Sequence, residues 1–151
     1  MRIILILFLS IFLNMGSNNF DFNKSSPLDL LDYLCKNPNE NFFIINPDSI
    51  PINWIKIEHI PYLIERIESE RISTPVFSIN AGIDLKYKNR TTEGVEALFM
   101  IESYRKKEKY PSTLSSTNCG VLKNGIFYPN QALIIEVKSW YKKTKKNQFS
   151  E

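Results

Sequence analysis

The chain has 151 residues, 43% of them hydrophobic and 23% charged, and a formal net charge of +3 at pH 7. This length and apolar content fit a single domain with one core. The charge is too small for a surface that binds nucleic acid, so we expect no nucleic-acid partner.

Residues 1–16 have the pattern of a secretory signal peptide. Arg2 supplies a minimal basic start, and residues 3–13 form an uncharged apolar run. This run is shorter than the ~20 apolar residues that a transmembrane helix needs. We therefore expect an exported protein, periplasmic or extracellular. Because the cleavage site is weak, a membrane-anchored form that keeps the signal is the alternative. The rest of the chain divides into a flexible polar lead-in, a single helical domain and a tail, at residues 17–25, 26–146 and 147–151.

The domain is predicted to begin with a helix that Ser26 caps, with Pro27 and Asp29 in its first turn. This helix runs to about Lys36. Residues 41–45 (NFFII) fit either a buried strand or a packed extended segment, because so short a run does not separate the two.

A second helical pattern covers residues 53–69, where isoleucine and leucine recur at helical spacing. Proline removes a backbone hydrogen bond, so Pro61 is expected in the first turn of the main helix. Residues 54–59 are then expected to form a preceding helical turn, with Trp54 packed under the helix start.

The connection from about Glu70 to Arg90 is long for a compact domain. We expect it to be irregular, with a short strand near residues 75–79 as the alternative. Long loops are often functional, so this connection is a candidate binding surface.

Residues 91–107 (TTEGVEALFMIESYRKK) predict the helix around which the domain is organised. Thr91 or Thr92 is expected to cap it. Apolar residues cover more than half of its circumference, so we expect the helix to lie between other elements. Gly94 is unfavourable inside a helix, which indicates either close approach of another backbone or a frayed first turn.

Asn124-Gly125 lies between two apolar pairs and predicts either a β-hairpin or a plain turn, because both residues tolerate positive φ. The last helix is predicted over residues 129–146, with an apolar stripe and a lysine-rich end. These lysines suit the negative end of the helix dipole. The alternative is that they contact an anionic membrane or polymer.

The sequence contains no phosphate-binding loop, dinucleotide-binding motif or nucleophile elbow, and we expect no cofactor. The single histidine, His59, cannot form a pair of histidine ligands, so no metal site is expected. Glu93 and Glu96 lie three apart in the predicted central helix and could serve a hydrolase, with His59 assisting. Structural ion pairs with arginine are the preferred interpretation of these carboxylates.

Cys35 and Cys119 are the only cysteines. Export favours a disulfide between them, which would tie the first helix to the loop before the last one. The alternative has equal weight: Cys35 is buried in the core and Cys119 remains a thiol.

The segments WIKIEHIPYLIERIES and TTEGVEALFMIESYRKKEKYPS lie within residues 54–112. In them the chain resembles small exported bacterial proteins that have no assigned activity, and its helix pair resembles a helical repeat of the HEAT type. The long intervening loop and the lack of a second copy depart from the repeat pattern, since repeat proteins need several units to bury their faces. The resemblance implies no catalytic residues.

These features predict a mainly α-helical single domain with three to four amphipathic helices, long loops and room for one short β-hairpin. The lack of catalytic motifs favours a non-catalytic binding protein whose partner is another protein, for example an immunity-type inhibitor of an envelope enzyme. The alternatives are a small carboxylate-dependent hydrolase of envelope polymer and an anchored structural component of the envelope. A membrane contact is expected only if the signal is retained. The candidate binding residues are aromatic: Trp54, Tyr62, Phe77, Tyr87 and Tyr104.

Overall fold

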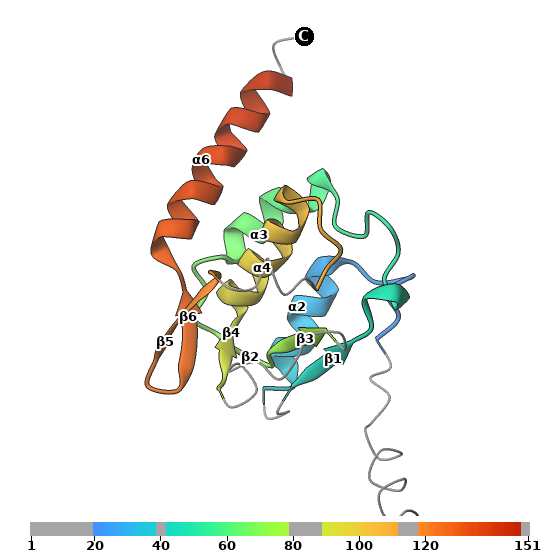
Figure 1. Cartoon of the computed structure of the whole chain (residues 1–151), viewed down its shortest axis with the longest axis vertical. Coiled ribbons are helices and arrows are strands. Elements are labelled where there is room, and N and C mark those ends of the chain that lie inside the picture. The colour runs from blue at the N-terminus through green and yellow to red at the C-terminus, as the bar shows by residue number, and fades with distance from the viewer. Residues whose placement is uncertain (1–19, 39–41, 79–88, 112–117, 149–151) are drawn as a thin grey trace, which may run out of the picture.

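A computed structural model describes residues 20–38, 42–78, 89–111 and 118–148 of the chain (Figure 1). Helices and short strands alternate along this part of the chain. In order, they are α2 (Pro27–Lys36), β1 (Phe43–Ile45), η1 (Pro47–Ser49), η2 (Ile57–His59), α3 (Ile60–Arg66), β2 (Ile72–Ser73), β3 (Val76–Ser78), β4 (Thr91–Thr92), α4 (Glu93–Arg105), β5 (Gly120–Lys123), β6 (Ile126–Pro129) and α6 (Gln131–Gln148).

The described residues form a mixed α/β fold, so the prediction of a mainly α-helical domain is wrong. Two of the three small sheets account for the error. β1 pairs with β3 in parallel, and β2 pairs with β4 in antiparallel. The alternative of a strand at residues 41–45 and near residues 75–79 is confirmed by β1 and β3, whereas β2 and β4 are too short to show the alternation by which a strand is recognised in a sequence. Each of these strands also pairs with a segment far from it along the chain.

The helix α4 lies at the centre of the fold, with α3 and α2 on either side of it (Figure 1). Every residue from Glu93 to Ser103 is buried, and the hairpin strand β6 also packs against the helix. The expectation that this helix lies between other elements is confirmed. A helix without a solvent face is stable only while its neighbours remain in place.

The first turn of α4 is held by the chain that follows α3. The amides of Glu93 and Gly94 donate to the carbonyls of Arg71 and Ser69, at 2.8 and 3.1 Å. Thr92 occupies the predicted N-cap position of the helix, but the expected side-chain cap is absent: neither the Thr91 nor the Thr92 hydroxyl makes a hydrogen bond with the described residues. The turn after α3 satisfies amides that a cap would otherwise satisfy.

At Gly94, the chain that follows α3 and the end of β6 approach the backbone of α4 closely. A Cβ atom at this position would lie 2.6 Å from the carbonyl oxygen of Ile67, 2.6 Å from a side-chain carbon of Pro129 and 2.8 Å from the carbonyl oxygen of Ser69. These distances confirm the expectation of close backbone approach. The frayed first turn is therefore not the reason for this glycine.

Several local predictions are confirmed. Ser26 and Asp29 form a reciprocal cap on α2, in which the Ser26 hydroxyl accepts from the Asp29 amide at 3.2 Å. Pro61 lies in the first turn of α3, after the short 3₁₀ turn η2. At the other end of the domain, Asn124 and Gly125 have φ values of 50° and 77° and join β5 to β6 in a hairpin.

The last helix begins later than predicted, because Pro129 ends β6 and Asn130 caps α6. The side-chain oxygen of Asn130 accepts from the Ala132 amide at 3.1 Å. The hairpin is also joined to the chain before β4: the amide of Phe127 donates to the Arg90 carbonyl at 2.8 Å.

The packed domain begins before the predicted start at residue 26. Phe20 and Phe22 pack against the core, with ring centroids 5.7 Å from Tyr33 and 5.3 Å from Trp54 respectively. The predicted signal peptide lies outside the described residues. Within them, no helix is both long enough and apolar enough to cross a membrane.

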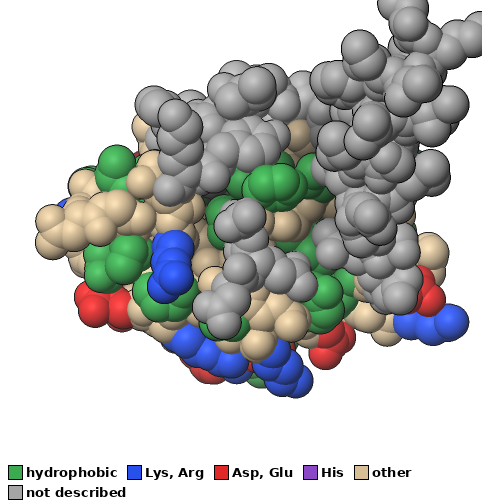
Figure 2. All heavy atoms as spheres, turned by 90° about the horizontal axis from the view of Figure 1, so that it is seen from below, with side chains coloured by type: hydrophobic (Ala, Val, Ile, Leu, Met, Phe, Trp, Pro, Cys, Tyr) green, Lys and Arg blue, Asp and Glu red, His purple; other side chains and the backbone are tan. Residues whose placement is uncertain are grey.

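Hydrophobic side chains gather near the middle of the face seen from below (Figure 2).

We predict that Gly94→Ala lowers the free energy of unfolding by about 2–3 kcal/mol, because a methyl group at this position overlaps two backbone carbonyls in a packed core. Urea unfolding of the two proteins measures the difference. The control is Ser139→Ala, an exposed position on α6, where a change within about 0.5 kcal/mol is expected. Equal stability of Gly94→Ala and the wild type would contradict the close approach.

Candidate functional site

An open groove of about 670 Å³ lies between the outer part of α6, the C-terminal end of α4 and the segment around η1 and η2. We call it the α6 groove. Three stretches of the described chain line it: residues 50–55 and 57, residues 103–105 and 107–110, and Trp140 with Thr144. Its volume lies within the range of known ligand sites, about 300–1,000 Å³.

Four aromatic side chains line the α6 groove: Trp54, Tyr104, Tyr110 and Trp140. The indole nitrogen of Trp54 donates to the Ser25 carbonyl at 2.8 Å, and its ring lies 6.0 Å from that of Tyr110. Across the groove, Tyr104 packs edge-on against Trp140 at 6.2 Å. Each ring is therefore held in place by a neighbour.

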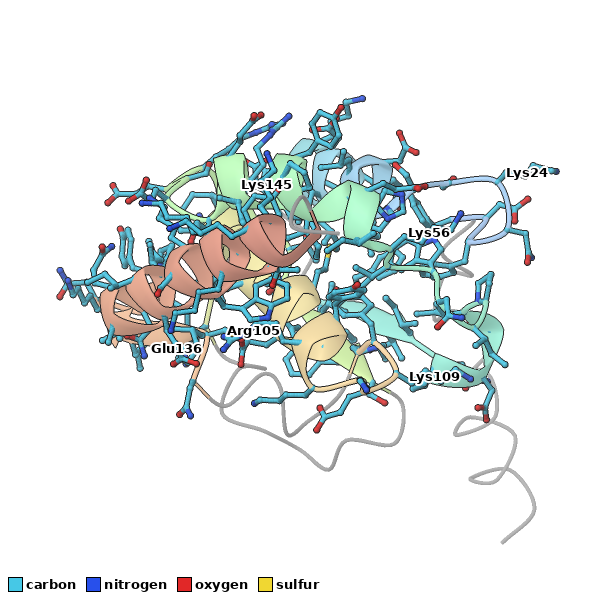
Figure 3. The ribbon with its side chains drawn as sticks, turned by 90° about the horizontal axis from the view of Figure 1, so that it is seen from above. Lys24, Lys56, Arg105, Lys109, Glu136 and Lys145 are labelled. Carbon is cyan, nitrogen blue, oxygen red and sulfur yellow. The ribbon has the colours of Figure 1, made fainter. Side chains whose placement is uncertain are left out.

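Arg105 connects the two helices that border the groove. Its guanidinium donates to Glu102 on α4 and, at 2.6 Å, to Glu136 on α6, and it lies 5.4 Å from the ring centroid of Trp140. Figure 3 shows it between α6 and the end of α4, with Glu136 beside it. This contact joins α4 to α6 beside Trp140. Three buried apolar side chains hold α6 on the core: Leu133, Ile134 and Val137.

Positive charge lies along the same edge. Lys109 pairs with Asp48 at 3.2 Å. Lys107 is exposed, and it pairs with no carboxylate of the described residues. Asn53 and Lys107 have positive φ values of 60° and 56°, and both line the groove. Strained backbone of this kind is concentrated at functional sites.

The structure brings together only part of the predicted binding set. Trp54 and Tyr104 both line the α6 groove. Tyr62 is 55% exposed on α3, and Phe77 is buried in β3; neither lines the groove. Tyr87 lies outside the described residues. The expected binding surface on the connection from residue 70 to 90 falls partly outside them too, since the structure describes only 70–78 and 89–90 of it.

Trp140 and Lys107 line the groove but are not among the binding residues predicted from the sequence. Trp140 follows Val137 at helical spacing, which places it on the apolar stripe of α6 and makes it look like a core residue. Lys107 is one of several lysines near helix ends. Their place in the groove follows only from the packing of α6 beside the end of α4.

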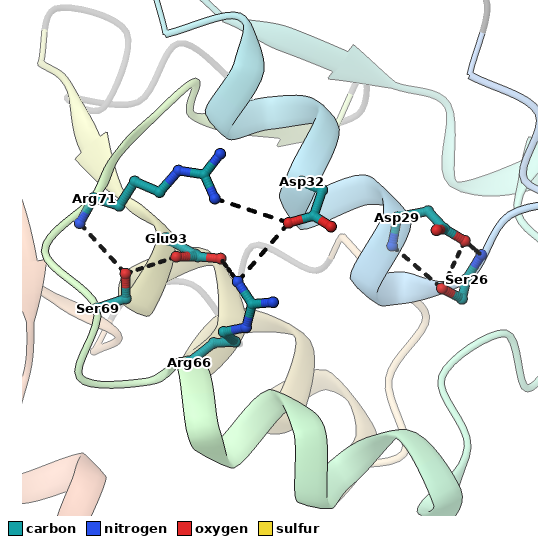
Figure 4. A network of polar contacts seen from close by, with 7 residues as sticks. All are labelled: Ser26, Asp29, Asp32, Arg66, Ser69, Arg71 and Glu93. Carbon is teal, nitrogen blue, oxygen red and sulfur yellow. Dashed lines mark hydrogen bonds and ion pairs between the residues drawn. The ribbon is translucent and has the colours of Figure 1, made fainter.

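The carboxylates considered for catalysis have structural surroundings. Glu93 is 2% exposed, and it accepts from Arg66 and from the Ser69 hydroxyl, each at 2.6 Å (Figure 4). Arg66 also lies 3.8 Å from Asp32, so the pair links α2, α3 and α4. The preferred interpretation, an ion pair with arginine, is confirmed for Glu93.

Glu96 is fully buried and influences another core group. The Tyr110 hydroxyl makes no hydrogen bond with the described residues, and its pKa is raised well above the usual value by burial and by the nearby Glu96 carboxylate. His59 lies elsewhere, with its Nδ1 accepting from the Lys56 amide at 3.1 Å. Burial lowers its pKa, and its charged neighbours are Glu58 and Lys56. Among the described residues, no cluster of histidine, cysteine and carboxylate side chains could hold a metal ion.

The two cysteines are buried thiols, so of the two equally weighted expectations the Cys35–Cys119 disulfide is not the one found. Their charged and polar neighbours differ. Cys35 neighbours Ser73 and the Glu93 carboxylate, and burial raises its pKa to about 11. Cys119 neighbours Tyr110, which lines the α6 groove.

Comparison of the chain with models of protein families, with curated proteins and with solved structures gives no significant match.

Removing the buried charge of Glu93 is predicted to destabilise the fold. Glu93→Gln should lower the free energy of unfolding by about 2 kcal/mol, less than for a fully buried pair because Arg66 is partly exposed. Asp48→Asn breaks an exposed pair and should cost about 1 kcal/mol or less. Urea unfolding measures both changes, and a larger effect of Asp48→Asn would show that burial does not set the strength of these pairs.

Thiol alkylation distinguishes buried thiols from a disulfide. In the native protein at mildly alkaline pH, both cysteines should react slowly with iodoacetamide, since both are buried and the pKa of Cys35 is about 11. In denaturant without a reductant, both should react at once. Intact-mass analysis counts the modified cysteines. Modification that appears only after reduction would show a disulfide instead.

Proposed function

We propose that this protein is a non-catalytic binding protein, and that it holds a segment of another protein in the α6 groove. One observation supports this most directly. The chain contains two tryptophans, Trp54 and Trp140, which lie far apart in the sequence. Both of them line the α6 groove. Aromatic side chains of this kind contribute a large share of the binding energy at protein interfaces.

The shape of the groove favours a chain segment over a small molecule. A pocket for a small molecule encloses most of its ligand. The α6 groove is open to solvent, with α6 as one of the three stretches of chain that line it, so a ligand in it keeps one side exposed. A helix or an extended segment of a partner, with apolar side chains at regular spacing, fits such a groove.

The residues that line the groove support binding more than catalysis. The described lining residues include no histidine or cysteine, and the carboxylates of Glu93 and Glu96 are buried away from solvent. A hydrolase built on these two carboxylates would need substrate to reach them. We therefore favour the binding function over the carboxylate-dependent hydrolase.

The place of action remains part of the proposal. An exported protein meets its partner outside the cytoplasm, and an inhibitor that occupies a surface of an envelope enzyme is one form of this function. In that form the partner segment contributes the apolar side chains, and this chain contributes Trp54, Tyr104 and Trp140.

The proposed function predicts that peptides bind at the groove. A random peptide library, displayed on phage and selected on the full chain, should yield peptides whose affinity falls at least about tenfold in Trp140→Ala, because a tryptophan at the centre of an interface is a frequent hot spot. Ser139→Ala, the exposed neighbouring position on α6, should bind as the wild type does.

Two results would overturn this proposal: enrichment of no peptide, or enriched peptides that bind Trp140→Ala as tightly as the wild type. Because Trp140 also packs against Tyr104, its variant is first checked for a wild-type melting transition. If that transition is lost, Thr144→Tyr takes its place. It adds bulk to the groove wall from a half-exposed position, and Ser139→Tyr is its control.

A further inference from the structure

We infer that the segment bound in the α6 groove is acidic, and that one of its carboxylates pairs with Lys107 while an apolar side chain beside it contacts Trp54 and Trp140. This inference rests on the proposed function and names the chemistry of the partner. It is carried by the backbone conformation of Lys107, by the charges around it and by the shape of the groove.

Lys107 occupies a position that normally favours glycine. It is the first residue beyond the cap of α4, where its amide donates to the Tyr104 carbonyl at 3.1 Å and the next amide, of Glu108, donates to the Ser103 carbonyl at 2.9 Å. This bonding pattern is the Schellman motif, whose left-handed residue is usually glycine. With a φ of 56°, Lys107 adopts a conformation that costs a side-chain-bearing residue about 1–2 kcal/mol.

Glycine would avoid the strain of this conformation, and what the lysine side chain offers the fold in return is a favourable interaction of its charge with the C-terminal end of the α4 dipole. The side chain is exposed, and no carboxylate of the described residues lies within ion-pairing distance of it. A strained residue with such a side chain, located on the edge of an aromatic groove, points to a role in binding.

The charges around Lys107 define what it can bind. Its neighbours Arg105 and Lys109 are already paired, Arg105 with Glu102 and Glu136 and Lys109 with Asp48. Among the described cations that line the groove, Lys107 is the one with no carboxylate within ion-pairing distance, and Glu108, the next residue, brings one carboxylate to the same lining. Charge complementarity assigns a carboxylate to the partner.

One further exposed lysine lies beside the groove on α6. Lys143 immediately precedes Thr144, which lines the groove, and it pairs with no carboxylate of the described residues. A partner segment that follows this side of α6 would meet its positive charge.

Two other occupants fit the structure less well. A second copy of this chain would also carry a formal charge of +3 and would bring its own lysines to the contact. An anionic lipid surface would satisfy the lysines. However, a flat lipid surface does not fill a groove of about 670 Å³ that three stretches of the chain line.

The experiment uses the full chain and the peptides selected on it. Both tryptophans line the groove, so tryptophan fluorescence reports binding there when the peptides contain no tryptophan. The selected peptides should be enriched in Asp and Glu. Replacing each acidic residue of a synthetic peptide by its amide should weaken binding about tenfold, and added salt should weaken the unmodified peptide more than the amide form.

The decisive variant is Lys107→Gly, because it removes the side chain and relieves the left-handed strain at the same time. Peptide affinity should fall about fivefold while the melting temperature is not lowered. Lys123→Gln, which also removes one exposed positive charge but lies on β5 outside the groove, should bind the peptide as the wild type does.

The outcomes separate this inference from the proposed function. Peptides that bind the groove without acidic enrichment, or that bind Lys107→Gly and the wild type equally, would overturn the acidic partner and leave the groove as a binding site. Peptides that bind Trp140→Ala as tightly as the wild type would show that the groove is not the binding site. Vesicles of phosphatidylglycerol and phosphatidylcholine, compared with phosphatidylcholine alone, test the lipid. Displacement of the bound peptide by the anionic vesicles would overturn the inference in favour of a membrane surface.

Discussion

The fold depends on the complete burial of α4. From Glu93 to Ser103 this helix has no side exposed to solvent, so every other element of the described domain is positioned by packing against it or against its neighbours. The N-terminal end of α4 is the tightest point. There, Gly94 lets the chain after α3 approach closely enough for two of its carbonyls to accept the first amides of the helix. A partly buried ion pair between Glu93 and Arg66 secures the same end.

The two ends of α4 have different roles. The N-terminal end is locked by hydrogen bonds, the ion pair and the approach at Gly94, whereas the C-terminal end is where the helix reaches the surface and borders the α6 groove. Arg105 joins this end of α4 to α6 through its contacts with Glu136 and Trp140. A binding surface whose walls are fixed in advance loses little conformational entropy when a partner binds.

In the proposed function, the groove would combine two kinds of recognition. Its aromatic rings offer a large apolar contact that is the same for many partners. Its uncompensated charge at Lys107 discriminates among them, since a partner that brings a positive charge to this edge is repelled and one that brings a carboxylate is attracted. The left-handed backbone at Lys107 is consistent with this division, because glycine would adopt the same conformation without strain.

The sequence by itself determined the local features: the Ser26 cap, the place of Pro61, the turn at Asn124-Gly125 and the central position of the helix that follows Thr92. Each of these follows from a few neighbouring residues, whose conformational preferences act over short distances. The pairing of β1 with β3 and of β2 with β4 was decided only in the tertiary structure, because strands of two or three residues do not by themselves specify a partner. The same holds for the groove. Trp54 and Trp140 are far apart along the chain, and only the packing of α6 against α4 brings them to one surface.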